Sequence, residues 1–258
     1  MSEKRRPSLG KLYGVGVGPG DPDLLTLKAL QVIKRVAHLF VASSTKNQYS
    51  LALRVIAPHL PQGKEIRRLA FPMTYDQEEL QKAWKANARI VIESLRSGDA
   101  AFLTLGDPCL YSTFGYLVRE VQKQAPEVEF EIVPGITAAQ AAAARLKLSL
   151  AEKDEAVLII PGTRAKTELK TWASRGNTLV LYKVYRQAQE ILDLLKESGR
   201  LSETKAISFC GMPEEKIYSS PPKERAFPYF TIFIVGGKEL RFESNLNSRP
   251  KIKITKEV

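Results

Sequence analysis

Residues 12–22 read LYGVGVGPGDP, an apolar run that passes straight into a glycine-rich loop. The run predicts a buried strand over residues 12–17, and the leucines that follow predict a helix over residues 24–37. Glycines in a turn between a strand and a helix let the backbone pass close to a ligand. The loop is therefore a candidate ligand-binding turn, and Asp21 is placed to cap the helix after it.

The loop fails the fingerprints of two nucleotide-binding classes. The dinucleotide pattern GxGxxG needs a third glycine, but that position is Pro19 in one frame and Asp21 in the other. The P-loop pattern fails because no Gly-Lys-Ser or Gly-Lys-Thr follows. Both failures oppose a nucleotide-dependent oxidoreductase.

Strand and helix patterns alternate along the chain, which predicts an α/β fold. The next predicted elements are strands over 36–42, 100–105 and 129–133, and helices over 76–97, 110–124 and 137–146. A second set has strands over 156–160, 178–182, 205–210, 216–218 and 230–235, with one helix between the first two of these strands and another over 187–198. The last three strands favour mixed or antiparallel pairing. The pattern of predicted strands and helices changes near Pro134, which predicts two α/β lobes, 1–134 and 135–258, with a cleft between them.

Two more loops follow predicted strands in the same manner as the first. Residues 103–112 read LTLGDPCLYS, where Gly-Asp-Pro again ends a buried strand. Residues 133–139 read VPGITAA, a stiff turn followed by small residues. Ligands of open α/β sheets bind beyond the carboxyl ends of the strands. The three loops are therefore expected to form one site.

Taken in order, GVGPGDPDLLTLKA (16–29), LTLGDPCLYS (103–112) and VPGITAA (133–139) resemble the tetrapyrrole methylase family, and the resemblance extends over about residues 10–237. It implies the tetrapyrrole methylase fold, in which S-adenosyl-L-methionine lies in a cleft between two α/β lobes. It also implies that backbone atoms hold most of this cofactor, that S-adenosyl-L-homocysteine is the product, and that the protein is a homodimer.

Three segments are most similar to the branch of the family that methylates precorrin-2 at carbon 20: KLYGVGVGPGDP (11–22), FPMT (71–74) and LYSTF (110–114). Members that methylate uroporphyrinogen carry Tyr-Asp-Arg-Leu after the second strand, whereas this chain has VASS at 41–44. The expected substrate is a reduced tetrapyrrole of the cobalamin pathway, with or without cobalt. Another corrin intermediate stays open as an alternative, with protein and RNA substrates ranked lower.

The resemblance also implies a set of cofactor-binding residues, carried over motif by motif. They are Pro19 in the first loop, Leu105, Gly106, Asp107 and Leu110 in the second, Thr137 and Ala138 in the third, and Lys183 and Gly211 in the second lobe. Relatives often have an apolar residue where this chain has Lys183, so only its backbone is expected to contact the cofactor.

The implied reaction places few demands on acid–base chemistry, because a methyl group on a sulfonium is already activated. Alignment of the reacting atoms is expected to carry most of the catalysis. Asp21 and Asp107 are candidate proton acceptors by position, although no essential base is expected.

Composition narrows the choice of ligand. The chain has 258 residues, a net charge of +11, two histidines and two cysteines without a CxxC pair. These counts exclude a histidine-rich metal site, predict no bound metal and favour a reduced, cytoplasmic protein. No apolar run approaches the roughly 18 residues that span a membrane. The basic start of the chain and the tail after Phe242 are expected to be loose ends.

The positive charge fits an anionic small molecule better than a nucleic acid, because lysine and arginine are scattered and no nucleic-acid-binding module is present. Arg67 and Arg68, just before residues 71–74, are predicted to bind carboxylates of the tetrapyrrole. A non-catalytic anion-binding protein is the alternative from a different class.

Overall fold

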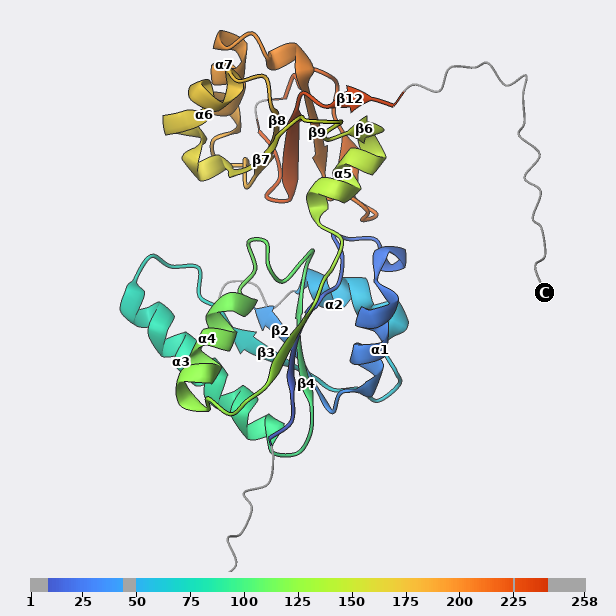
Figure 1. Cartoon of the computed structure of the whole chain (residues 1–258), viewed down its shortest axis with the longest axis vertical. Helices are drawn as coiled ribbons and strands as arrows, with labels where there is room; N and C mark the ends of the chain where they lie inside the picture. The colour runs from blue at the N-terminus through green and yellow to red at the C-terminus, as the bar shows by residue number, and fades with distance from the viewer. Residues whose placement is uncertain (1–8, 44–49, 225, 241–258) are drawn as a thin grey trace, which may run out of the picture.

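The computed structural model describes residues 9–43, 50–224 and 226–240, which form two α/β lobes (Figure 1). The terminal segments predicted as loose ends lie almost entirely outside these ranges. Within the described ranges, no helix combines the length and the apolar character needed to cross a membrane.

The first lobe is built on a five-stranded parallel sheet in the order β3-β2-β4-β1-β5. Its strands are β1 (Leu12–Gly16), β2 (His38–Ser43), β3 (Ile66–Ala70), β4 (Ala100–Thr104) and β5 (Phe130–Val133). All strands point the same way, so their carboxyl ends share one edge of the sheet. That edge carries the first, second and third loops.

Four helices cover the two faces of this sheet: α1 (Leu27–Arg35), α2 (Leu51–Ile56), α3 (Gln77–Leu95) and α4 (Phe114–Gln124). In Figure 1, α1 and α2 lie on one side of the strands, and α3 and α4 lie on the other. Each face has its own buried cluster, one around Val15 and Leu39 and the other around Phe40, Phe102 and Phe114. Burial on both faces explains why β1 and β4 are almost continuously apolar.

Two predicted helices begin later than expected. The predicted helix 110–124 starts only at Phe114, since Tyr111 has a φ of 52° and the Ser112 hydroxyl accepts the N–H of Phe114. The predicted helix 24–37 starts at Leu27, because a 3-10 turn (Pro22–Leu24) comes first and Thr26 caps the helix. In both cases the residues before the helix lengthen the loop at the edge of the sheet.

The second lobe is built on a mixed sheet in the order β10-β9-β11-β8-β7. Its strands are β7 (Val157–Pro161), β8 (Thr178–Tyr182), β9 (Thr204–Ser208), β10 (Lys216–Ile217) and β11 (Thr231–Val235). Only β7 and β8 pair in parallel, which confirms the predicted mixed pairing. A short ladder joins β6 (Leu148–Ser149) to β12 (Lys238–Glu239), and 3-10 turns occupy Ala57–His59, Gly162–Arg164 and Leu201–Glu203.

Helices cover both faces of the second sheet as well. The helices α6 (Ala165–Ala173) and α7 (Ala188–Glu197) belong to one buried cluster with Leu179 and Phe233. On the other face, α5 (Ala138–Leu146) packs its alanines against Val180 and Ile232. Small side chains let this helix approach the sheet closely.

In the described ranges the chain passes from one sheet to the other once, between the end of β5 and the start of α5. Thr137 begins α5 with a capping box, in which its hydroxyl accepts the N–H of Gln140. Contacts between the lobes also include an ion pair in which Arg54 Nη1 lies 2.7 Å from Glu214 Oε1.

Candidate functional site

The first and second loops are joined directly through their backbones at the edge of the parallel sheet. The N–H of Gly106 donates to the carbonyl of Gly18 at 2.7 Å, and the N–H of Gly18 donates back at 3.3 Å. The third loop packs onto the same point, where a Cβ on Gly135 would lie 2.2 Å from the Gly106 oxygen. Only glycine permits that approach, so the three loops form one rigid base.

Gly106 differs from its neighbours because the space in front of it is open. Its φ is +72°, and a Cβ built there would meet no atom within 4 Å. The left-handed backbone therefore leaves a bare surface at this position.

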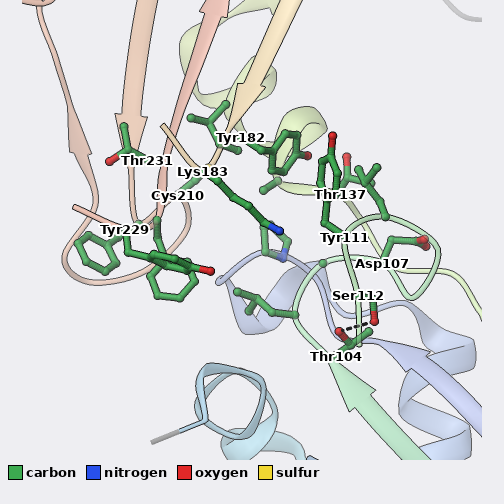
Figure 2. Close-up of a pocket in the computed structure, with 18 of the residues that line it drawn as sticks. Thr104, Asp107, Tyr111, Ser112, Thr137, Tyr182, Lys183, Cys210, Tyr229 and Thr231 are labelled. Atoms are coloured by element: carbon green, nitrogen blue, oxygen red, sulfur yellow. Dashed lines mark hydrogen bonds between the residues drawn. The ribbon is translucent and has the colours of Figure 1, made fainter. Parts of the chain in front are cut away.

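That surface faces a cavity of about 260 Å³ between the two lobes. Figure 2 shows side chains from both lobes surrounding it. The first lobe contributes Pro19, Thr104, Leu105, Gly106, Asp107, Leu110, Tyr111, Ser112 and Thr113, and the segment leading into α5 contributes Thr137 and Ala138. The second lobe contributes Tyr182, Lys183, Ile207, Phe209, Cys210, Met212, Tyr229, Phe230, Thr231 and Ile232.

The structure brings together all the predicted cofactor-binding residues of the three loops, and Lys183 with them, around this cavity. Gly211 lies beside it, in the wall of an adjoining cavity of about 300 Å³ that also contains Asp21. Cys210 and Met212 line both cavities. Whether these residues bind a cofactor stays a prediction.

The two candidate proton acceptors are held differently. Asp107 lines the main cavity, and its two carboxylate oxygens accept the N–H groups of Cys109 and Gly135. Asp21 lies outside the main cavity, and its carboxylate accepts the N–H of Asp23 at 2.9 Å. Both carboxylates therefore serve as caps for backbone N–H groups.

Arg67 and Arg68 lie on the edge strand β3 and line neither cavity. Arg67 donates to the Ser94 hydroxyl at 2.9 Å, and its guanidinium lies 5.7 Å from the centre of the Phe40 ring. These contacts hold Arg67 against α3. A substrate role for the two arginines stays a prediction that the cavity does not support.

The aromatic side chains of the cavity were not predicted from the sequence. Tyr111 and Tyr182 lie with ring centres 5.4 Å apart, and Tyr229 and Phe230 lie 4.8 Å apart. The Tyr182 hydroxyl also accepts the N–H of Ala139 at 2.9 Å, in the first turn of α5. Tyr111 lies within the motif of residues 103–112, and the other aromatic residues lie at strand ends, which is the available sequence signal.

Burial sets the protonation of several groups around the cavity. It raises the pKa of the phenols of Tyr111, Tyr182 and Tyr229 above the usual value, so all three stay neutral at neutral pH. Burial also raises the pKa of the Cys210 thiol to about 11. The described residues contain no cluster of histidine, cysteine, aspartate or glutamate able to hold a metal ion.

This arrangement is suited to holding ligands rather than to strong acid–base chemistry. Asp107, the one acidic side chain among the described residues that line the cavity, accepts two backbone N–H groups, and the phenols and the thiol of the cavity stay protonated at neutral pH. Its walls combine bare backbone with aromatic rings. Such a cavity can align two molecules and exclude water from the space between them.

The chain is similar to known proteins in sequence and in fold. The family model for tetrapyrrole (corrin/porphyrin) methylases matches residues 11–225. A probable cobalt-precorrin-2 C(20)-methyltransferase of Methanocaldococcus jannaschii is 40% identical over 186 residues, 72% of this chain and 77% of the relative. The cobalt-precorrin-2 C(20)-methyltransferase of Salmonella typhimurium is 33% identical over 230 residues, 88% of this chain and 96% of the relative.

Solved structures agree on the architecture. A cobalt precorrin-4 methyltransferase aligns with a TM-score of 0.67 at 21% identity, covering 90% of this chain and 97% of its own. The uroporphyrin-III C-methyltransferase of Thermus thermophilus, complexed with S-adenosyl homocysteine, aligns with a TM-score of 0.65 at 23% identity, covering 88% and 92%. These alignments confirm the predicted fold of two α/β lobes.

Proposed function

The chain belongs to the tetrapyrrole (corrin/porphyrin) methylase family, and we propose that it transfers a methyl group from S-adenosylmethionine to carbon 20 of cobalt-precorrin-2 or its metal-free form. The observation that carries this proposal is the cavity between the lobes, built from the three strand-end loops. Relatives at 33% and 40% identity that are named for this reaction on cobalt-precorrin-2 support the choice of substrate. The reaction belongs to cobalamin biosynthesis.

The cavity fits a cofactor that is held by backbone atoms. The open space in front of Gly106 would be filled by any side chain, and Ala138 and Pro19 add little bulk beside it. Contacts to the cofactor come from Pro19, Leu105, Gly106, Asp107, Leu110, Thr137 and Ala138, from the backbone of Lys183, and from Gly211 at the margin. S-adenosylmethionine supplies a methyl group on a positively charged sulfur when it is bound.

The residues of the chain orient the reactants and exclude water. Well-aligned reactants gain about 7–11 kcal/mol relative to free encounter, so alignment alone accounts for much of the expected acceleration. Asp107 holds the loops in place through its backbone partners, which leaves it poorly placed to remove a proton. The absence of an essential base is therefore part of the proposal.

We extend this proposal to the partners, the oligomeric state and the location of the enzyme. The substrate is a small tetrapyrrole, and neither nucleic acid nor membrane is a partner. The family resemblance supports a homodimer. Two free cysteines among the described residues, one exposed and one buried, support a reduced cytoplasmic location.

Mass spectrometry with an isotopically labelled methyl donor tests the reaction directly. The protein is incubated with precorrin-2 and, separately, with its cobalt form, and the labelled carbon is located by NMR. We expect one labelled methyl group at carbon 20. Transfer to another carbon would favour a different corrin reaction. Binding of the methyl donor and the tetrapyrrole without methyl transfer would favour the anion-binding alternative.

A further inference from the structure

Three side chains reach the cavity from residues with unusual backbone angles. Tyr111, Lys183 and Phe209 have φ values of 52°, 56° and 52°, and each lies in a different loop. A left-handed conformation costs a residue with a side chain about 1–2 kcal/mol. Glycine would avoid that cost, and all three of these strained residues line the cavity, which together indicate a role for their side chains there.

Lys183 is the most informative of the three. Among the described residues that line the cavity it is the only basic one, and it forms no ion pair with a described carboxylate. Its ammonium lies 5.0 Å from the centre of the Tyr111 ring. Figure 2 shows the side chain extending from the end of β8 into the space between Tyr229 and Tyr111. The sharp turn after β8 thus directs a positive charge into the cavity.

A second cation follows on the same turn. The guanidinium of Arg186 lies 5.3 Å from the centre of the Tyr185 ring, which lies 4.9 Å from the ring of Tyr229. Tyr229 continues the row to Phe230, and both rings line the cavity. Arg186 is exposed and forms no ion pair with a described carboxylate. A row of aromatic rings therefore connects this guanidinium to the cavity.

We propose that Lys183 and Arg186 bind carboxylates of the tetrapyrrole substrate, and that Tyr229 and Phe230 contact its macrocycle. This assignment rests on the proposed function. A large, mostly apolar macrocycle with acidic side chains is complemented by an aromatic surface with cations beside it, and the turn after β8 offers both. The backbone of Lys183 serves the cofactor, whereas its ammonium serves the substrate.

Substitution of Lys183 with matched controls tests the assignment. Lys183→Met removes the charge, and Lys183→Arg keeps it. Lys147→Met removes a lysine with a similar φ of 54° that lines neither cavity. For each variant, titration calorimetry measures the affinity for S-adenosylhomocysteine, absorbance titration measures the affinity for the tetrapyrrole, and steady-state assays give KM and kcat.

We expect Lys183→Met to raise the tetrapyrrole Kd and KM about tenfold, in line with loss of one charge-assisted hydrogen bond. Cofactor affinity should be unchanged, Lys183→Arg should recover most of the loss, and Lys147→Met should match the wild type. Arg186→Gln should raise KM by a smaller factor, because Lys183 lines the cavity whereas Arg186 lies outside its lining, against the Tyr185 ring. The KM of the wild type should rise with salt more steeply than that of Lys183→Met.

Three results would overturn the assignment. One is unchanged tetrapyrrole affinity in Lys183→Met, and another is a loss confined to S-adenosylhomocysteine, which would give the ammonium to the cofactor carboxylate. The third is a raised KM only in the double variant Arg67→Ala, Arg68→Ala. If the proposed reaction is wrong, the wild-type protein binds the tetrapyrrole without methylating it. In that case the tetrapyrrole affinities of the wild type and Lys183→Met still decide the role of Lys183.

Discussion

The Asp107 carboxylate accepts the N–H of Gly135 at 2.9 Å, which ties the second loop of the site to the third. Its other oxygen accepts the N–H of Cys109 at 2.8 Å and closes the turn in which it lies. An aspartate with both oxygens engaged in this way stabilises the shape of the loops. The main role of the Asp107 carboxylate is therefore to stabilise the geometry of the site.

Substitution of Asp107 by asparagine should reduce stability more than it slows chemistry. An amide has one acceptor oxygen, so one of the two N–H groups would lose its partner, at a cost of about 1–3 kcal/mol in the free energy of unfolding. The methyl-transfer rate should fall less than about 100-fold, the low end of what a general base contributes. Denaturant unfolding and single-turnover kinetics measure the two effects.

Asp21→Asn is the matched control, since Asp21 uses one oxygen to accept the N–H of Asp23 and asparagine retains that ability. It should change both stability and rate little. A thousandfold loss of the methyl-transfer rate in either variant, with cofactor binding intact, would identify that carboxylate as an essential base.

Gly106→Val should weaken cofactor binding at least tenfold, about 1.4 kcal/mol. The new side chain would enter the open space in front of Gly106 and would strain a φ of +72°. Gly63→Val is the control, because Gly63 has a φ of +76° and equally open surroundings but does not line the cavity. Both variants should lose similar stability, and calorimetry with S-adenosylhomocysteine should separate them. Equal affinity in the two would reduce Gly106 to a turn residue.

S-adenosylhomocysteine should raise the melting temperature of the wild-type protein, because a ligand that binds only the native state stabilises it by mass action. NADH and ATP should have little effect, since the first loop lacks both nucleotide fingerprints. Differential scanning fluorimetry checks all three ligands. A shift with NADH and none with S-adenosylhomocysteine would contradict the proposed cofactor.

Alkylation should distinguish the two cysteines near neutral pH. The thiolate is the reactive form, and burial raises the pKa of Cys210 to about 11, so nearly all of it stays protonated at pH 8. Cys109 is exposed and should react first with iodoacetamide. Peptide mass spectrometry over time measures both sites, and faster labelling of Cys210 would contradict the buried environment described for it.

The sequence predicted the elements whose burial is simple. Strands β1 and β4 are covered on both faces and read as apolar runs, and α3 carries a clear stripe from Trp84 to Leu95. Strand β3 was missed because it lies at the sheet edge, where Arg67 and Arg68 are exposed and interrupt the alternation of apolar residues. The short helix α2 was missed as well, since six residues carry too little periodicity.

The candidate site was predicted where it depends on backbone and missed where it depends on side chains. Glycines and prolines mark the loops in the sequence, because few other residues tolerate such close approach. The aromatic wall formed by Tyr182, Tyr229 and Phe230 comes from strand ends that only the folded second lobe brings together. The direction of the Lys183 side chain depends on its left-handed backbone conformation, which a lysine in the sequence does not predict.

Within the part of the chain that the structure describes, the single passage between the two sheets has a thermodynamic consequence. With one covalent connection, the two lobes depend on noncovalent contacts to unfold together. A ligand that touches both walls of the cavity is lost when either lobe opens, so its binding energy opposes the unfolding of each. Occupancy of the cavity should therefore merge the melting of the two lobes into one cooperative transition, with the ligand acting as the second link between them.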